Sequence, residues 1–232
     1  DKQIKAIFFA RGGYGSVRII DKVDFSPLEN NPKWLIGYSD VTAILNHVYF
    51  KHSVASLHAI MPVNIKKEIF DSSAIESMLN LLFGKEFSFT TSCDFVQKDC
   101  KVKGKIIGGN LSVLYSLLGS ESFGETDDLI LLIEDLDEYL YHIDRMMQAL
   151  KRAGKLKNLK ALLVGAMTQM HDNTIPFGKT AYRIIEEAVK QYNYPKIFGA
   201  SIGHIEERNN AVIIGGEMEI KVEENTIITK QL

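Results

Sequence analysis

The start of the chain alternates short apolar runs with segments of helical spacing. Residues 4–10 (IKAIFFA) are apolar and rich in β-forming side chains, and they lead into a glycine-rich turn. Residues 40–50 (DVTAILNHVYF) carry apolar side chains three and four positions apart, which predicts an amphipathic helix. In all, we expect strands at 4–10, 32–37 and 54–57 and helices at 16–22 and 40–50. Consecutive strand-to-helix units favour a parallel sheet.

The pattern changes after residue 65. We expect helices at 72–83, 137–153 and 176–192, a mixed polar and β stretch at 87–105, a Gly108-Gly109-Asn110 segment followed by a helix, and strands at 128–134, 161–167, 211–215, 218–222 and 226–230. Asp71, Ser72 and Ser73 provide N-cap residues for the first of these helices. The fold class is therefore α/β. We expect an N-terminal domain at 1–65, a linker region at 66–100 and a C-terminal domain at 101–232.

Composition and charge exclude several classes of protein. Hydrophobic residues are 46% of the 232 and charged residues 24%, as in ordinary globular proteins. The 27 Lys and Arg are balanced by 29 Asp and Glu, so no basic excess draws the chain to nucleic acid or to an anionic membrane. No apolar run approaches the roughly 20 residues that span a bilayer. Cys93 and Cys100 are too few for a disulfide scaffold or a cysteine zinc site, and we expect neither a metal nor a cofactor.

Ser39 is the first candidate catalytic residue. It lies in the segment Gly37-Tyr38-Ser39-Asp40, between a predicted strand and a predicted helix. A serine in such a turn is held out of the sheet, and the helix behind it offers backbone N–H groups to an oxyanion. The pattern is only part of a nucleophile elbow, because Val41 stands where the second glycine would be. The alternative is that Ser39 or Asp40 simply caps the helix.

Glu134 and His204 are candidate partners of this serine. Glu134 follows the apolar run 129–133, at the carboxyl end of a strand, where open α/β sheets build their sites. His204 follows a glycine in a loop and can take a proton near neutral pH. Serine, acid and histidine in this chain order occur in α/β-hydrolases. The alternatives are a solvated turn for Glu134 and a surface loop position for His204, and His58, which ends the third strand, is a competing histidine.

The glycine turn at 12–16 (GGYGS) allows two interpretations. It lacks the lysine and the spacing of a phosphate-binding loop, and it does not fit the G-x-G-x-x-G pattern of dinucleotide sites. We therefore expect it to bring backbone N–H groups close to Ser39.

Five segments in order resemble the motifs of the LD-carboxypeptidases, a family of serine peptidases that includes the murein tetrapeptide carboxypeptidases. They are ARGGYGSVR at 10–18, PKWLIGYSDVT at 32–42, GGNLS at 108–112, LIED at 132–135 with YHIDR at 141–145, and GH at 203–204. The resemblance covers nearly the whole chain.

The resemblance implies a fold, an activity and a set of site residues. The fold would be a Rossmann-like parallel-sheet N-terminal domain joined to a C-terminal α/β domain with a swivelling β-barrel-like core. The activity would be the release of terminal D-alanine from murein tetrapeptides, by a homodimer in the cytoplasm. Ser39 would be the nucleophile, Glu134 the acid and His204 the base, with Glu138, one helical turn further on, as a weaker candidate for the acid.

Three more residues are expected to contact the substrate of such an enzyme. The backbone N–H groups of Gly13 and Asp40 would hold the developing oxyanion. The Arg11 guanidinium would bind a substrate carboxylate, since its planar fork of donors suits that group; the alternative for Arg11 is a structural ion pair.

Two features depart from the family pattern. The family usually has a further strand and helix ahead of its first motif, whereas this chain starts at Asp1, so we expect that it begins inside a longer protein. A sheet without those strands would expose an edge and apolar surface. His58-Ala59-Ile60 stands where the family has His-Gly-Pro, so we expect a loop of different shape there and a less certain substrate preference.

Two other functions stay open at this point. One is that of the related microcin C self-immunity peptidases, which cleave acyl-sulfamoyl adenylates. The other is a catalytically inactive homologue that only binds peptides.

Overall fold

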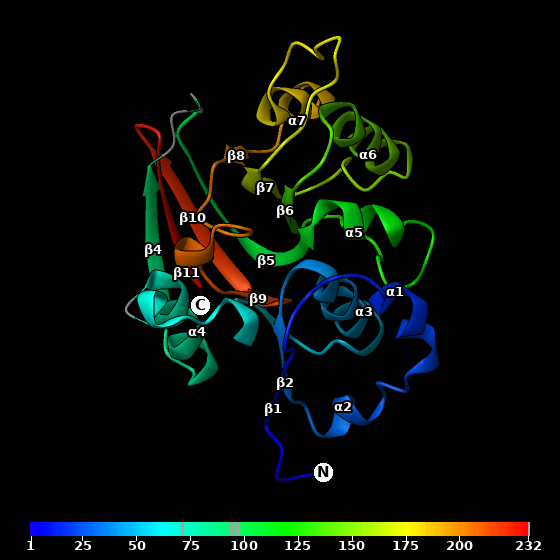
Figure 1. Cartoon of the computed structure of the whole chain (residues 1–232), viewed down its shortest axis with the longest axis vertical. Coiled ribbons are helices and arrows are strands. Elements are labelled where there is room, and N and C mark those ends of the chain that lie inside the picture. The colour runs from blue at the N-terminus through cyan, green and yellow to red at the C-terminus, as the bar shows by residue number, and fades with distance from the viewer. Residues whose placement is uncertain (71, 93–94, 96–97, 232) are drawn as a thin grey trace.

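A computed structural model describes residues 1–70, 72–92, 95 and 98–231. The cap expected from Asp71, and Cys93, lie outside these residues. The first of two sheets has four strands in the order β1-β2-β3-β9 (Figure 1). The strands β1 (Ala6–Phe8), β2 (Trp34–Gly37) and β3 (Ser56–His58) are parallel, as predicted, and β9 (Val212–Ile214) joins β3 antiparallel from the far end of the chain.

The second sheet has seven strands in the order β4-β11-β10-β5-β6-β7-β8. They are β4 (Phe87–Ser92), β5 (Cys100–Asn110), β6 (Ile130–Leu136), β7 (Ala161–Thr168), β8 (Lys196–Phe198), β10 (Glu217–Glu223) and β11 (Thr226–Gln231). The strands from β5 to β8 are parallel, whereas β10, β11 and β4 pair antiparallel. The α/β fold class is thus confirmed, and the barrel-like part of the expectation stays a prediction.

Helices flank both sheets. They are α1 (Ser16–Ile19), α2 (Pro27–Asn30), α3 (Thr42–His52), α4 (Ser73–Leu82), α5 (Leu111–Ser116), α6 (Leu140–Arg152) and α7 (Ala181–Val189), with single 3-10 turns at Ile20–Lys22, Ser39–Val41, Pro62–Asn64, Lys67–Ile69 and Glu206–Arg208. In Figure 1 the N-terminal unit lies on one side of β5 and β9 and the antiparallel strands β4, β10 and β11 lie on the other. In the described chain, none of the helices combines the length and apolar character needed to cross a bilayer.

The amphipathic prediction for α3 is wrong. Every residue from Thr42 to Val48 is buried, including Asn46 and His47. The reason is that α3 packs against two strands: β3 of the first sheet and β5 of the second, which contacts the side chain of Asn46. The Asn46 side chain accepts a hydrogen bond from the N–H of Gly108 at 3.0 Å and donates one to the carbonyl of Gly108 at 3.0 Å. The amide of Asn46 thus replaces water for a strand backbone.

Two further segments differ from the sequence-based expectation. The strand β8 was not predicted, because three residues that begin with Lys196 carry too short a pattern. Gly108 and Gly109, for which no strand was predicted, belong to β5. A side chain at Gly108 would place its Cβ 2.1 Å from the Leu132 carbonyl oxygen, so Gly108 lets β5 lie close to β6; a Cβ at Gly109 would lie 2.7 Å from the Thr42 hydroxyl oxygen, so Gly109 lets β5 lie close to α3.

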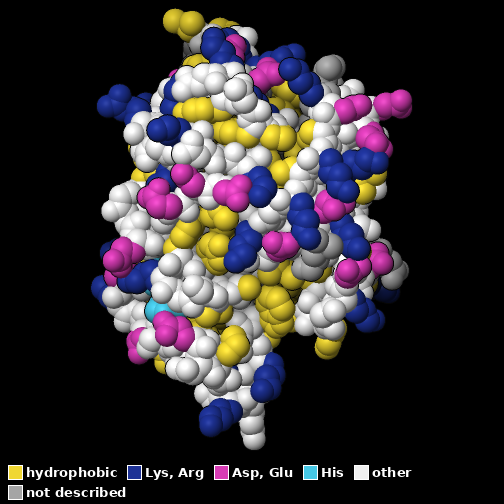
Figure 2. Space-filling model, turned by 180° about the vertical axis from the view of Figure 1, so that it is seen from behind, with side chains coloured by type: hydrophobic (Ala, Val, Ile, Leu, Met, Phe, Trp, Pro, Cys, Tyr) yellow, Lys and Arg dark blue, Asp and Glu magenta, His cyan; other side chains and the backbone are white. Residues whose placement is uncertain are grey.

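The surface carries both signs of charge. Figure 2 shows Lys and Arg side chains interspersed with Asp and Glu over one face, in keeping with a formal net charge of -2. β1 is an edge strand of the first sheet. Its Ile7 and Phe8 are exposed, and so is Ile4, which precedes it.

Candidate functional site

Ser39 lies at a strained turn directly after β2. Tyr38 has an extended backbone. Ser39 has a φ of 62°, in the left-handed region that few residues other than glycine adopt. The chain then enters the 3-10 turn and α3, whose N-terminus has no side-chain cap. The interpretation of Ser39 or Asp40 as a cap of this helix is therefore wrong. The geometry is that of a sharp strand-to-helix turn, which holds the serine out of the sheet.

The glycine turn packs against Ser39. A Cβ at Gly12 would lie 2.9 Å from the Ser39 Cβ and 3.0 Å from its Oγ, so only glycine allows this approach. Asp40 fixes the turn from the other side, because its Oδ2 accepts hydrogen bonds from the Ser16 N–H at 3.0 Å and the Ser16 hydroxyl at 2.7 Å. Within the described residues, no backbone carbonyl accepts from the N–H of Gly13 or of Asp40.

Glu134 and His204 form a buried pair. Glu134 lies near the carboxyl end of β6 and is fully buried, and its Oε2 lies 2.6 Å from Nδ1 of His204. The His204 side chain is 12% exposed. A solvated turn for Glu134 and a surface position for His204 are therefore both excluded.

The loop that carries His204 is shaped by Gly203. This residue has a φ of 107°, and a Cβ there would lie 2.6 Å from Oε2 of Glu134. Its N–H donates to the Asn209 side chain at 2.8 Å, which fastens the loop. Any larger residue would push the loop away from Glu134, with which His204 pairs.

Burial and hydrogen bonding set the protonation of the pair. Burial alone would raise the pKa of Glu134, but the hydrogen bond with His204 and the nearby His58 outweigh it and hold that pKa below its ordinary value. Burial alone would lower the pKa of His204, but the hydrogen bond with Glu134 and its charge raise it. The pair is thus poised as a carboxylate beside an imidazole of increased basicity.

Tyr38 brings the turn of Ser39 to this pair. Its ring centroid lies 4.8 Å from that of His204 and 5.9 Å from that of His58. The described chain contains no hydrogen bond between Ser39 and His204. Such bonds are often long in a site without substrate and shorten when substrate binds.

The competing residues have other contacts. Glu138 pairs with Nδ1 of His142 at 2.5 Å. His58 is fully buried at the end of β3, with its Nε2 3.9 Å from Oε1 of Glu134. Arg11 is exposed and precedes the glycine turn.

The sequence analysis did not predict that Asp135 is a buried carboxylate that bonds the start of α5. This residue is 1% exposed, and its carboxylate accepts hydrogen bonds from the Asn110 side chain at 2.8 Å and from the Ser112 N–H at 2.9 Å. Burial and the neighbouring Glu134 raise the pKa of Asp135 to about 7. The sequence signal for Asp135 was its position directly after Glu134 in the segment LIED. The two neighbouring acids have different partners: Glu134 bonds His204, and Asp135 bonds Asn110 and Ser112.

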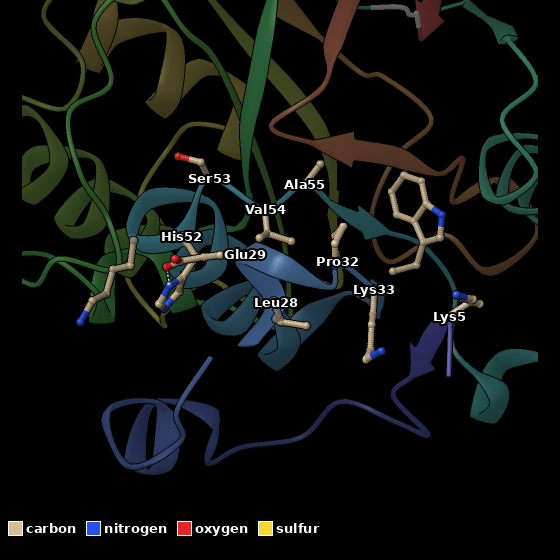
Figure 3. A pocket seen from close by; sticks show the side chains of 11 residues that line it. Lys5, Leu28, Glu29, Pro32, Lys33, His52, Ser53, Val54 and Ala55 are labelled. Atoms are coloured by element: carbon tan, nitrogen blue, oxygen red, sulfur yellow. Dashed lines mark hydrogen bonds and ion pairs between the residues drawn. The ribbon is translucent and has the colours of Figure 1, made fainter. Parts of the chain in front are cut away.

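A separate cavity of about 890 Å³ lies at the amino ends of the parallel strands of the first sheet (Figure 3). It is lined at the start of β2 by Trp34 and at the end of α3 by His52. Several polar side chains of its lining have other partners: His52 contacts Glu29 at 2.6 Å, and the Lys33 ammonium donates to two backbone carbonyls. Since Ser39 follows the other end of β2, this cavity is not the candidate site.

Among the described residues, no group of three or more His, Cys, Asp or Glu is placed to hold an ion. Cys100 is a half-buried free thiol in β5, and burial raises its pKa.

The sequence and the fold are similar to those of known proteins. Over 98% of this chain and 72% of the relative, it is 31% identical to the "Probable murein peptide carboxypeptidase" of Bacillus subtilis. A muramoyltetrapeptide carboxypeptidase from Oxalobacter formigenes has the same fold, with a TM-score of 0.89 at 23% identity over 100% of this chain and 80% of that one. The microcin C7 self-immunity protein MccF, solved with aspartyl sulfamoyl adenosine, gives a TM-score of 0.83 at 21% identity over 98% and 76% of the two chains.

The family comparison covers both parts of the chain. Residues 1–59 match the family described as the LD-carboxypeptidase N-terminal domain, and residues 103–220 match the LD-carboxypeptidase C-terminal domain. Together with the relative in Bacillus subtilis, these matches show that the chain belongs to the LD-carboxypeptidase family.

Proposed function

We propose that this chain is a serine carboxypeptidase that releases terminal D-alanine from murein tetrapeptides, with Ser39, Glu134 and His204 as its catalytic triad. The observation that carries the proposal is the buried hydrogen bond between Glu134 and His204 beside the strained turn of Ser39. Family membership and the names of the relatives support the substrate class. The cytoplasm as its location and a homodimer as its assembly are parts of the proposal that rest on the family resemblance.

The reaction begins with proton transfer from Ser39. His204 uses Nδ1 for Glu134, which leaves Nε2 to accept the Ser39 proton. The Ser39 oxygen then attacks the carbonyl carbon of the bond before D-alanine, and the imidazolium of His204 is stabilised by Glu134. When the tetrahedral intermediate collapses, His204 gives the proton to the leaving amine of D-alanine. Water then cleaves the acyl-enzyme by the same route.

Backbone donors stabilise the charge that develops on the carbonyl oxygen. Asp40 directly follows Ser39, and Gly13 directly follows Gly12, which packs against Ser39; the N–H groups of Asp40 and Gly13 have no backbone acceptor among the described residues. Losing one such donor typically lowers kcat by about 100-fold to 1,000-fold. Arg11, exposed at the entrance to the glycine turn, would bind the terminal carboxylate of the substrate.

The test is a hydrolysis assay with a defined murein tetrapeptide, in which release of D-alanine is measured. An acyl-sulfamoyl adenosine serves as the second substrate, because the likeness to MccF makes that activity the main alternative. Faster cleavage of the adenylate would replace the proposed substrate. A chain that cleaves neither substrate, and that a serine-reactive phosphonate does not label at Ser39, would be an inactive homologue.

A further inference from the structure

Glu134 leaves one carboxylate oxygen without a hydrogen bond. Its Oε2 accepts from His204 at 2.6 Å, but Oε1 is fully buried and has no hydrogen-bond partner in the described chain. A buried anionic oxygen without a donor is costly, by more than an ordinary lost hydrogen bond. Such an atom in an otherwise well-packed site indicates a donor that comes into place during function.

His58 is the group that faces this oxygen. Its side chain is fully buried, and both of its ring nitrogens lack hydrogen-bond partners among the described residues. Its Nε2 lies 3.9 Å from Oε1 of Glu134, which is about 1 Å longer than an N–H···O hydrogen bond. Two orphaned buried groups of opposite hydrogen-bonding character thus lie next to each other. A shift of about 1 Å would satisfy one atom of each.

The two residues come from different sheets. His58 ends β3, where it is the register partner of Gly37 in β2, two residues before Ser39. Glu134 lies in β6 of the second sheet. A bond between them would therefore tie the strand pair that carries the nucleophile to the strand that carries the acid.

From this geometry we infer that His58 is a positioning residue, which donates a hydrogen bond from Nε2 to Oε1 of Glu134 and so holds Oε2 of that carboxylate against His204. The inference rests on the proposed function. In the neutral imidazole the proton is on Nε2, and Glu134 lies between two imidazoles, one from each sheet. The carboxylate then cannot rotate away from His204 while the proton from Ser39 is being transferred. Partners that orient a functional group in this way typically contribute about 10-fold to 100-fold to activity.

Three substitutions separate this role from simple packing. His58→Gln puts an amide N–H near the position of Nε2, whereas His58→Asn puts it near the position of Nδ1, which does not face Glu134. His58→Leu removes the donor altogether. We expect kcat to fall about 10-fold to 100-fold in the Asn and Leu variants with KM changed less than twofold, and the Gln variant to keep kcat within a few fold.

A spectroscopic signature tests the inference without activity. The His204 Nδ1 proton, in a short charge-assisted bond, should give a strongly downfield proton resonance. It should persist in His58→Gln and be lost in His58→Asn and His58→Leu. His47→Leu is the matched control, since His47 is also buried but bonds Ser122 at 2.7 Å, and it should keep the resonance. Thermal unfolding of each variant confirms that it is folded, and the Gln and Asn pair decides the outcome if the Leu variant does not fold.

Two results would overturn the inference. One is an Asn variant that matches the Gln variant in both kcat and the downfield resonance. The other is a Gln variant that loses both while it remains folded. If the resonance follows the expected pattern but no tetrapeptide is cleaved by the wild type, the proposed function fails and the positioning role of His58 stands.

Discussion

At the scale of single residues, the sequence predicted which residue types form the candidate site, but not how deeply they are buried or which residues they contact. Short motifs predicted Ser39, Glu134 and His204 as candidate catalytic residues, since a motif reports residue type and spacing. The burial of His58 against Glu134 could not be predicted, because it depends on the packing of β3 against β6. The pairing of Glu138 with His142 was also not predicted: Glu138 lies just before α6, and His142 lies in its first turn.

The nucleophile assignment gives the first prediction. Ser39→Ala should lower kcat/KM for the tetrapeptide by roughly four to six orders of magnitude, because the acyl-enzyme cannot form. The thermal unfolding temperature should change little, since Ser39 is only partly buried. Ser116→Ala is the control: its hydroxyl bonds a carbonyl of its own helix at 2.6 Å, and activity should be normal. Near-normal activity in Ser39→Ala would remove Ser39 from the triad.

At the scale of secondary-structure elements, the sequence predicted some segments more closely than others. β6 and α6 were predicted to within a few residues, because an unbroken apolar run and a 3.6-residue period are strong signals. β8 was missed, and α7 begins at Ala181 rather than at 176 because Thr180 caps it through the Arg183 N–H. Some residues of the candidate site lie in loops, such as the loop that carries His204. Loops have no hydrophobic periodicity, so the sequence pattern could not predict their conformation.

The loop before His204 gives the second prediction. Gly203→Ala should lower kcat/KM by about 100-fold or more, because the new Cβ would lie 2.6 Å from Oε2 of Glu134 and displace the loop. Gly154→Ala is the matched control, since Gly154 also has a positive φ, of 80°, but has open space around its Cβ. That control should lose about 1 kcal/mol of stability and keep its activity. Equal activities in the two variants would show that the close approach of Gly203 to Glu134 is unimportant.

At the scale of the whole molecule, the site exists only where the two sheets meet. The sequence predicted successive strand-to-helix units but not that β9, from residues 212–214, pairs with β3 in the first sheet. That pairing brings the chain after His204 back to the strand of His58. Long-range pairing of this kind leaves no local pattern, so it required the structure. The proposed domain ranges 1–65, 66–100 and 101–232 stay a prediction.

The buried pair gives a prediction about stability. The pKa of Glu134 is lowered on folding, so its contribution is present above its ordinary value of 4.5 and is lost as the pH falls toward the folded value. The pKa of His204 is raised, so its contribution is complete below 6.5 and is lost as the pH rises through the folded value. We therefore compare the unfolding free energy of the wild type with that of Glu134→Gln at each pH. The difference should favour the wild type most between pH 4.5 and 6.5, by roughly 1–3 kcal/mol more than at lower or higher pH. Urea unfolding at a series of pH values measures it, and a difference that does not vary with pH would contradict the coupling.

The same coupling predicts the pH dependence of catalysis. His204 must be neutral to take the proton from Ser39, and contact with Glu134 raises its pKa above 6.5, so kcat/KM should rise with pH along a limb above that value. Glu134→Gln removes the charge but leaves the burial, which by itself lowers the pKa of His204. The limb should then move to lower pH while the plateau falls, because the imidazolium is no longer stabilised.

The control for this measurement is Glu138→Gln. Glu138 pairs with His142, so its loss should leave the limb and the plateau unchanged. A limb that stays in place in Glu134→Gln would restrict Glu134 to holding His204 in position, without an electrostatic effect. If Glu138→Gln shifted the limb and Glu134→Gln did not, the acid would be Glu138, four residues further along the chain. A wild-type rate that is constant between about pH 5 and 8 would count against a histidine base, because an imidazole titrates in that range.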